Sequence, residues 1–276
     1  MTQMAVCARG SLGRGISRVL ALAVSGLVLS GCAQASTIIT VAPNSKAEPG
    51  AAASTDEVPV LTAPSSTARP MSSTERALAA LEQAERATIS TCVMRGTTGA
   101  VSTYKGAEEM PADALLAVIL PVIAARNDDP GAMTLPIAQD RAGVEAQVHR
   151  LGDDSGVAAG LTALDDRVTT TSTTTALQAC TDIDAALLGD VLDERSNSSY
   201  REALLSAASR GIAESFRASV PDGWTTAGTV LVSGTTAGAV AVLSGVHWST
   251  VVTVFVTGAA DPADVISRAT QIALTA

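Results

Sequence analysis

The residues that could carry out hydrolytic chemistry in this chain lie around Ser155. Asp154 precedes this serine directly, and His149 lies six residues upstream. A serine, a histidine and an aspartate can form a catalytic triad, but triads are defined by geometry in the folded protein and not by proximity along the chain. Asp and Ser before an apolar run are also typical of a helix N-cap or a turn, and we favour that role over a nucleophile.

Acidic side chains near His149 raise the question of a cation site. Asp153 and Asp154 precede one predicted helix, and Asp165 and Asp166 follow it. Neither a calcium-loop motif nor two histidines at helical spacing accompany them. We therefore expect these carboxylates to be solvated helix ends, and we expect no metal site and no cofactor.

The N-terminal segment has the features of an export signal. Arg9, Arg14 and Arg18 form a positive region, and the apolar run Val19–Ser30 is short for a membrane span. The run ends in Leu29-Ser30-Gly31-Cys32, which resembles the bacterial lipobox, in which the cysteine is lipidated and becomes the mature N-terminus. The alternative is an ordinary secretory signal with an incidental cysteine. We expect residues 1–31 to be a lipoprotein signal peptide.

This signal predicts a lipid-anchored protein on the extracytoplasmic face of the cell membrane. Acyl chains such as palmitate on Cys32 would hold it there, because each buried methylene adds roughly 0.8 kcal/mol. The segment that follows is rich in Ala, Ser, Thr and Pro and lacks a sustained apolar period. We therefore interpret residues 32–70 as the lipidated cysteine and a flexible tether.

Two further cysteines, Cys92 and Cys180, remain in the mature chain. An exported protein meets an oxidising compartment, so the two can form a disulfide. Two buried thiols are the alternative.

Charge and composition exclude one class of partner. The formal net charge of the 276 residues is −9, and aromatic residues make up 2% of them. Nucleic-acid binding needs clustered Lys and Arg to neutralise phosphates, and single strands are held on aromatic platforms. We expect no nucleic-acid partner. A membrane, a cell-wall component or another envelope protein fits better.

The elements that must position any site begin near residue 71, and we interpret residues 71–276 as one folded domain. Residues 221–256 contain three nearly continuous apolar runs separated by Gly-containing turns, which is typical of three consecutive strands buried on both faces. Two more strands are predicted over 88–95 and 100–104. Helices are predicted over 73–84, 114–125, 137–151, 156–164, 174–188, 199–218 and 262–276.

This order predicts the fold class. Strands near both ends of the domain, with a helical block between them, indicate an α/β (α+β) sandwich. We expect an antiparallel sheet of about five strands built from both termini, helices on both of its faces and a mostly helical middle subdomain.

The order of elements resembles that of class A β-lactamases and penicillin-binding-protein-like serine hydrolases. Pro221-Asp222-Gly223-Trp224 looks like the segment before the third strand of that family, and Val220–Ala276 is the best-matching region. Residues 169–188 look like the family's helix that begins with two threonines. The resemblance covers the whole domain with sparse identities. It implies a degenerate actinobacterial lipoprotein member of the family.

The catalytic motifs of the family are where this chain departs. The family has Ser-x-x-Lys at the start of the apolar helix, where the lysine helps to activate the serine. In this chain alanines stand at both positions, and the methyl group of an alanine can neither attack a carbonyl nor carry a proton. The Ser-Asp-Asn and Lys-Thr-Gly motifs are also absent, and no Glu lies in the loop near residue 166. The aligned positions are Ala114 for Ser, Ala117 for Lys and Asp154-Ser155-Gly156 for Ser-Asp-Asn. The place of Lys-Thr-Gly is taken by Thr229-Val230-Leu231 or, with a shift, by Val232-Ser233-Gly234.

The loss of four separate motifs predicts a catalytically inactive protein of binding or scaffolding function. The alternative is a serine hydrolase whose nucleophile has moved, for example to Ser155 or Ser233.

Overall fold

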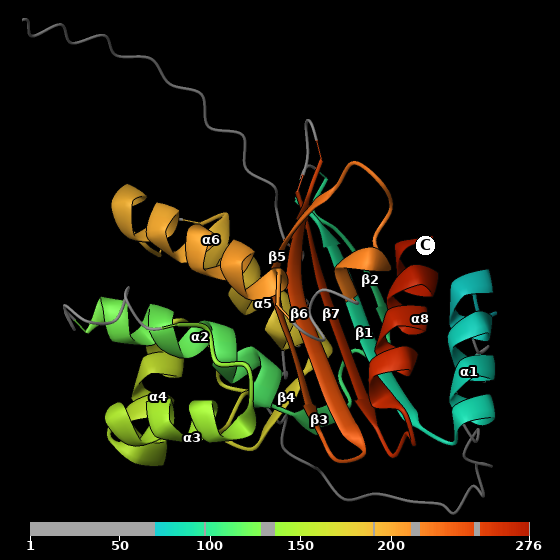
Figure 1. The fold of residues 1–276 in the computed structure, drawn as a ribbon, viewed down its shortest axis with the longest axis horizontal. Helices are drawn as coiled ribbons and strands as arrows, with labels where there is room; N and C mark the ends of the chain where they lie inside the picture. The colour runs from blue at the N-terminus through green and yellow to red at the C-terminus, as the bar shows by residue number, and fades with distance from the viewer. Residues whose placement is uncertain are drawn as a thin grey trace, which may run out of the picture. The chain divides into compact units, whose positions relative to one another are not determined.

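A five-stranded antiparallel sheet lies at the centre of the part of the chain that this computed structural model describes, residues 70–275 without 97, 128–135, 190, 211–215 and 246–248. The predicted signal, Cys32 and the tether lie outside the described residues. The strand order is β2-β1-β7-β6-β5 (Figure 1). The strands are β1 (Thr88–Arg95), β2 (Ala100–Tyr104), β5 (Thr225–Ser233), β6 (Thr236–Ser244) and β7 (Ser249–Thr257).

Pairing between β1 and β7 joins the two ends of the domain. Ile89 lies opposite Val256, and the register continues along the whole of β1. In β6 and β7 every residue except the first and last is buried. This pattern follows from their continuous apolar sequence, and it requires helices on both faces. The predicted fold class is therefore confirmed.

Helices cover the two faces of the sheet in unequal numbers. On one face lie α1 (Ser73–Glu85) and α8 (Pro262–Leu274), which contact each other as well as the sheet. The other face carries the helices from the middle of the chain (Figure 1). These are α2 (Asp113–Arg126), α3 (Arg141–Arg150), α4 (Asp153–Ala163), α5 (Ala176–Leu187) and α6 (Glu194–Ala208).

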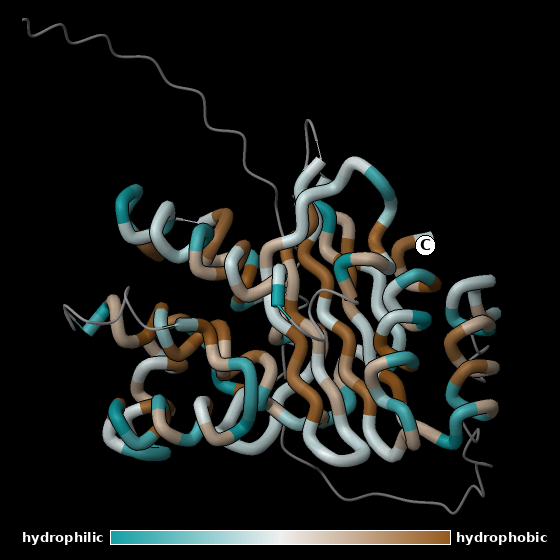
Figure 2. Tube along the Cα trace, viewed as in Figure 1, coloured by the Kyte–Doolittle hydropathy of each residue, from teal (hydrophilic) through white to brown (hydrophobic). Residues whose placement is uncertain are grey.

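Each face has its own hydrophobic core. Leu78 of α1, Ile266 of α8 and Val254 of β7 belong to the core between the sheet and the helix pair. The larger core lies on the opposite face, where Phe255 packs with α2 and its neighbours. Figure 2 shows hydrophobic residues concentrated along the strands and along α2.

Helix α2 is the central element of the helical subdomain. Every residue from Ala114 to Ala124 is buried, as expected for a helix that is apolar on all sides. It contacts β5 and β6 on one side and α3, α4, α5 and α6 on the others. Its first turn therefore lies against the sheet, at the position where the sequence places the degenerate catalytic motif.

Side-chain caps define several helix ends. Ser72 and Glu75 form a capping box at the start of α1, and Asp140 caps α3. A different cap, Asp193, explains why α6 begins earlier than predicted. Asp193 accepts a hydrogen bond from the Ser196 N–H at 2.9 Å, so the helix begins at Glu194 rather than at 199.

Two short strands were not predicted. β3 (Glu109–Pro111) pairs with β4 (Thr173–Thr175) to form a separate two-stranded sheet. This pairing places Pro111 at the end of a strand, two residues before α2. It also delays the start of α5, because Thr175 is the N-cap of that helix.

None of the helices in the described ranges is long and apolar enough to cross a membrane.

Candidate functional site

The candidate site lies where the first turn of α2 meets β5 and β6. Ala114 is 2% exposed and Ala117 is fully buried. These are the two positions that the family resemblance aligns with the nucleophile and its lysine. Both side chains are methyl groups packed in the larger core, so neither position offers a hydroxyl or an amine.

Strand β6 approaches Ala114 at a glycine. A Cβ atom added to Gly238 would lie 2.6 Å from the Cβ of Ala114 and about 3 Å from the ring of Phe255. Such a contact is far shorter than van der Waals packing allows. The strand and the helix therefore touch directly beside Ala114.

The space left between α2, β5 and β6 is very small. A hollow of about 10 Å³ remains there, lined by residues that include Ala114, Gly238 and Ser233. A single water needs a cavity of roughly 10–15 Å³. The hollow has room for about one water, far less than the roughly 300–1,000 Å³ of typical small-molecule clefts.

Thr229 on β5 is buried at 2% exposure and ties the strand to the loop before α3. Its hydroxyl donates to the carbonyl of Ala138 at 3.4 Å and accepts from the Gln139 side chain at 3.3 Å. The position aligned with the family's strand lysine therefore holds a neutral hydroxyl. That hydroxyl fastens the helical subdomain to the sheet edge.

Gln139 was missed by the sequence reasoning, which placed the polar loop of the site at residues 154–156. The residues that lie against Thr229 are instead Ala138 and Gln139, in the loop before α3. Asp140 at the N-cap of α3 was the available sequence signal, since a capped helix start fixes the loop that precedes it.

The charged groups beside the hollow are Asp113 and Arg141. Arg141 forms an ion pair with Glu145, with 3.0 Å between Nε and Oε1. Its hydrogen bond to Glu145, followed by the charge of Asp113, raises the pKa of Arg141 above its usual value. Arg141 and Glu145 therefore form an exposed ion pair beside the hollow.

Ser233, one of the two alternative nucleophiles, does line the hollow. It is half-buried at the end of β5, and its carbonyl accepts a hydrogen bond from the Thr236 hydroxyl at 2.8 Å. Neither a histidine nor a lysine is among the described residues around the hollow. Activation of Ser233 would have to come from Asp113, the one carboxylate there.

Ser155, the other alternative, lies in the first turn of α4 together with Asp154 and Gly156. It is exposed, and its hydroxyl donates to the carbonyl of Gly152 at 3.1 Å. His149 is paired with Asp153 at 2.9 Å and not with the serine, while Asp154 accepts from Thr171 at 2.7 Å. These contacts fit the predicted helix-end role.

One aspartate differs from the prediction of solvated carboxylates. Asp153, Asp154 and Asp165 are exposed, but Asp166 is only 2% exposed. The reason is that its Oδ1 accepts hydrogen bonds from the N–H groups of residues 168 and 169 at 2.8 and 3.0 Å, which fold the loop over it.

Asp166 faces a second buried carboxyl, Asp182 of α5. Burial first, and then the hydrogen bond and charge of Asp166, raise the pKa of Asp182 to about 8. The Oδ2 atoms of both side chains are buried and have no partner among the described side chains and backbone. The proton that Asp182 holds up to this pKa gives its carboxyl a donor for Asp166.

Cys92 of β1 and Cys180 of α5 are buried free thiols in the structure, so the predicted disulfide is not formed there. Burial, followed by interaction with Cys92, raises the pKa of Cys180 well above its usual value. The two thiols are thus neighbours, and their oxidation in an exported chain stays a prediction. Counting free thiols in the denatured, unreduced protein checks it.

The described residues contain no group of three or more His, Cys, Asp or Glu side chains arranged to hold a metal ion.

No protein-family model matches the chain, and no curated protein matches its sequence. Solved structures do resemble it. A β-lactamase from Streptosporangium roseum is 19% identical, with a TM-score of 0.61 over 73% of this chain and 97% of that one. A second similar structure is the reconstructed last common ancestor of the class A β-lactamases of Gram-negative bacteria. It is 18% identical, with a TM-score of 0.63 over 74% of this chain and 99% of that one. The chain therefore has a β-lactamase-like fold.

Proposed function

We propose that this chain, with its β-lactamase-like fold, is a non-catalytic binding or scaffolding lipoprotein of the cell envelope. The observation that carries the proposal is the hollow of about 10 Å³ between α2, β5 and β6. A hydrolase needs a cleft that admits a substrate and a nucleophile beside a base. Methyl groups at Ala114 and Ala117 and a glycine–alanine contact occupy that place instead.

The envelope location rests on the sequence alone. A positive segment, an apolar run and a lipobox-like Leu29-Ser30-Gly31-Cys32 stand in the order that lipoprotein signals require. A lipid on Cys32 would leave the domain outside the cytoplasmic membrane. Cell-wall components and other envelope proteins are then its available partners.

A covalent probe of serine nucleophiles tests the absence of catalysis. The full chain is incubated with a fluorescent penicillin and, separately, with a fluorophosphonate, and labelling is read after denaturing electrophoresis. We expect no labelling by either probe, because no described serine near α2 and β5 has a histidine or lysine beside it.

The alternative function is a hydrolase with Ser233 as a relocated nucleophile, since this serine lines the hollow together with Asp113. Labelling of the wild-type chain that disappears in Ser233→Ala would establish it and refute the proposal. Ser155→Ala serves as the matched control, because that exposed serine already donates its hydroxyl hydrogen to Gly152. Loss of labelling in Ser155→Ala would equally refute the proposal.

A further inference from the structure

A much larger hollow lies on the opposite face of the sheet, between the first turn of α1, the edge strand β2 and the end of α8. Its volume is about 380 Å³, within the range of ligand-binding clefts. Eight of its thirteen lining residues carry a hydroxyl group, and one, Glu75, carries a charge. This groove, which we call the α1–β2 groove, is therefore polar, and none of its thirteen described lining residues is basic.

Thr91 of β1 lies at the floor of the α1–β2 groove. The residue is 2% exposed and lines the groove. A group that enters the groove can approach the hydroxyl-bearing side chain of Thr91 there.

The wall of the groove is β2, which has no further strand beside it among the described residues. β2 is the last strand of the sheet, and four of its five residues are exposed. Its sequence, Ala-Val-Ser-Thr-Tyr, contains neither a charged residue nor a proline, the features with which proteins usually protect an edge. Residues 101–104 all line the groove, so the groove follows the strand. The outward N–H and C=O groups of β2 are a template for another strand.

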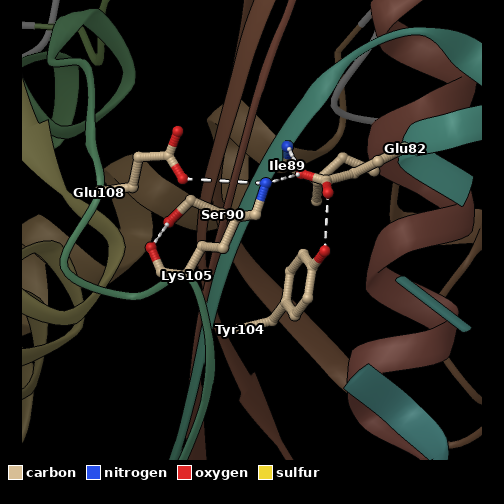
Figure 3. Close-up of polar contacts among 6 residues, drawn as sticks. All are labelled: Glu82, Ile89, Ser90, Tyr104, Lys105 and Glu108. Carbon is tan, nitrogen blue, oxygen red and sulfur yellow. Dashed lines mark hydrogen bonds and ion pairs between the residues drawn. The ribbon is translucent and has the colours of Figure 1, made fainter. Parts of the chain in front are cut away.

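The end of the groove at Tyr104 is acidic. Figure 3 shows that the Tyr104 hydroxyl donates to Oε2 of Glu82, at 2.6 Å, and that Glu108 faces Lys105. The Lys105 Nζ lies 2.9 Å from Oε1 of Glu82. Glu82 also accepts from the Ile89 N–H at 2.7 Å, which fixes α1 to the sheet.

Burial, then the hydrogen bond to Glu82, then the charges of Glu82, Glu108 and Glu75, raise the pKa of Tyr104. Against these three carboxylates stands one cation, Lys105, among the residues that interact with Tyr104. The field at this end of the groove repels anions and attracts cations.

We propose that the α1–β2 groove binds an extended segment of another envelope protein that carries lysine or arginine, and that this segment adds to β2 as a sixth strand. The inference rests on the proposed binding function and supplies its site. Main-chain hydrogen bonds to β2 provide affinity, and alternate side chains of the segment point into the groove. One of them meets the Thr91 hydroxyl, and a basic one meets the carboxylate of Glu75.

Hydrogen–deuterium exchange of the full chain, read by mass spectrometry, tests the site. The probe is a capped heptapeptide of alternating lysine with threonine or valine, at millimolar concentration. We expect exchange of amides in residues 100–104 to slow by about tenfold or more. A matched peptide with alternate backbone nitrogens methylated has the same charge but cannot pair with a strand. It should give no protection.

Two substitutions examine the groove itself. Thr91→Val preserves shape but removes the hydroxyl, and should weaken peptide binding by about two- to tenfold. Glu75→Gln preserves the capping box, because that motif accepts Glu or Gln at this position. The substitution removes a negative charge, so it should weaken peptide binding by about two- to fivefold at low salt and by less at high salt. Glu202→Gln, on exposed α6, removes one carboxylate elsewhere and should leave the affinity unchanged.

Several outcomes would overturn this inference. The first two are that the peptide does not slow amide exchange in β2, or that the methylated peptide binds equally well. The third is that the peptide slows exchange only in β5, at the other edge of the sheet. The fourth is that cell-wall glycan fragments slow exchange in β2 and the peptide does not. The penicillin and fluorophosphonate experiments are independent of the groove. If the chain stays unlabelled while the peptide fails, the proposed binding function stands and only the assignment of this groove falls.

Discussion

Individual side chains decide whether the family's chemistry can exist in this fold, and Ala117 is the clearest of them. It is fully buried among apolar residues of α2 and its neighbours. An ammonium group placed there would be buried among these apolar side chains, and burying a charge is costly. Ala117 thus contributes to the packing of the core, in addition to lacking the amine of the family's lysine.

We predict that Ala117→Lys lowers the free energy of unfolding by about 3 kcal/mol or more, measured by urea denaturation. Ala159→Lys, on the exposed face of α4, is the matched control and should change stability by less than about 0.5 kcal/mol. The double variant Ala114→Ser with Ala117→Lys should hydrolyse no β-lactam, because the hollow remains too small. Equal stability of Ala117→Lys and Ala159→Lys would show that position 117 is open to water.

The Asp166–Asp182 pair gives stability a pH dependence with a defined sign. The folded-state pKa of Asp182 is about 8, whereas an unfolded aspartate titrates near about 3.9. Between these values the folded chain holds an extra proton. The contribution of this group to stability is therefore complete below about pH 4 and is lost as the pH rises towards 8.

We predict that Asp182→Asn removes the loss of folding stability that the wild-type chain shows as the pH rises from about 4 to 8. Asn keeps an oxygen for the hydrogen bond from Gln178 and can donate to Asp166. Relative to wild type, the variant should gain at most about 1.4 kcal/mol per pH unit between pH 4 and 8, followed by thermal or urea unfolding at several pH values. Asp222→Asn, at an exposed position, is the control and should show no such trend. A difference that shrinks as the pH rises would contradict the assignment.

At the scale of elements, close approach between α2 and α4 holds the helical subdomain together. A Cβ atom added to Gly160 would lie 2.2 Å from Cγ2 of Ile123 and 3.1 Å from its Cβ. These atoms belong to the stiff, branched part of the isoleucine, which cannot rotate away cheaply. The glycine therefore sets the distance between the two helices.

We predict that Gly160→Ala destabilises the protein by about 1–3 kcal/mol, although alanine is the better helix former. Ile123→Leu removes the branch at Cβ, so the double variant should lose less stability than the sum of the single variants. Urea denaturation of the four proteins measures the coupling. Strict additivity would mean that α4 can shift away from α2 without cost.

Elements with strong local signals were predicted well. The apolar runs of β5 to β7, the helix α2 and the helix α8 after Asp261-Pro262 lie where the sequence indicates. The three-residue strands β3 and β4 were missed because so short a stretch has no period to detect. The start of α6 was misplaced because its cap, Asp193, precedes a polar first turn and not an apolar run.

The candidate site was only partly predictable. Ala114, Ala117 and Thr229 follow from the alignment of motifs, and the structure places all three between α2 and β5. The contact of Gln139 with Thr229 joins residues 90 positions apart, and no local pattern announces it. The closure at Gly238 depends on how near two backbones approach, which is a tertiary property.

At the scale of the whole molecule, the N-terminal segment separates the folded domain from its predicted anchor. We predict that Cys32→Ala releases the protein from the membrane fraction into the soluble fraction, because no acyl chain can then be attached. Immunoblotting of fractionated cells measures the distribution. Substitution of Cys92, which is buried in the sheet, is the control and should leave the chain in the membrane fraction. Retention of the Cys32→Ala protein would refute lipidation.

The strand order has a consequence for biogenesis. β1 lies between β2 and β7, so its inner neighbour is a segment that ends at Thr257. During synthesis, β1 and β2 alone would form a two-stranded ribbon, which is marginally stable at best in water. The sheet closes only when the last fifth of the polypeptide has left the ribosome. Until then β1 lacks its inner neighbour, which suits the export that we propose for this chain.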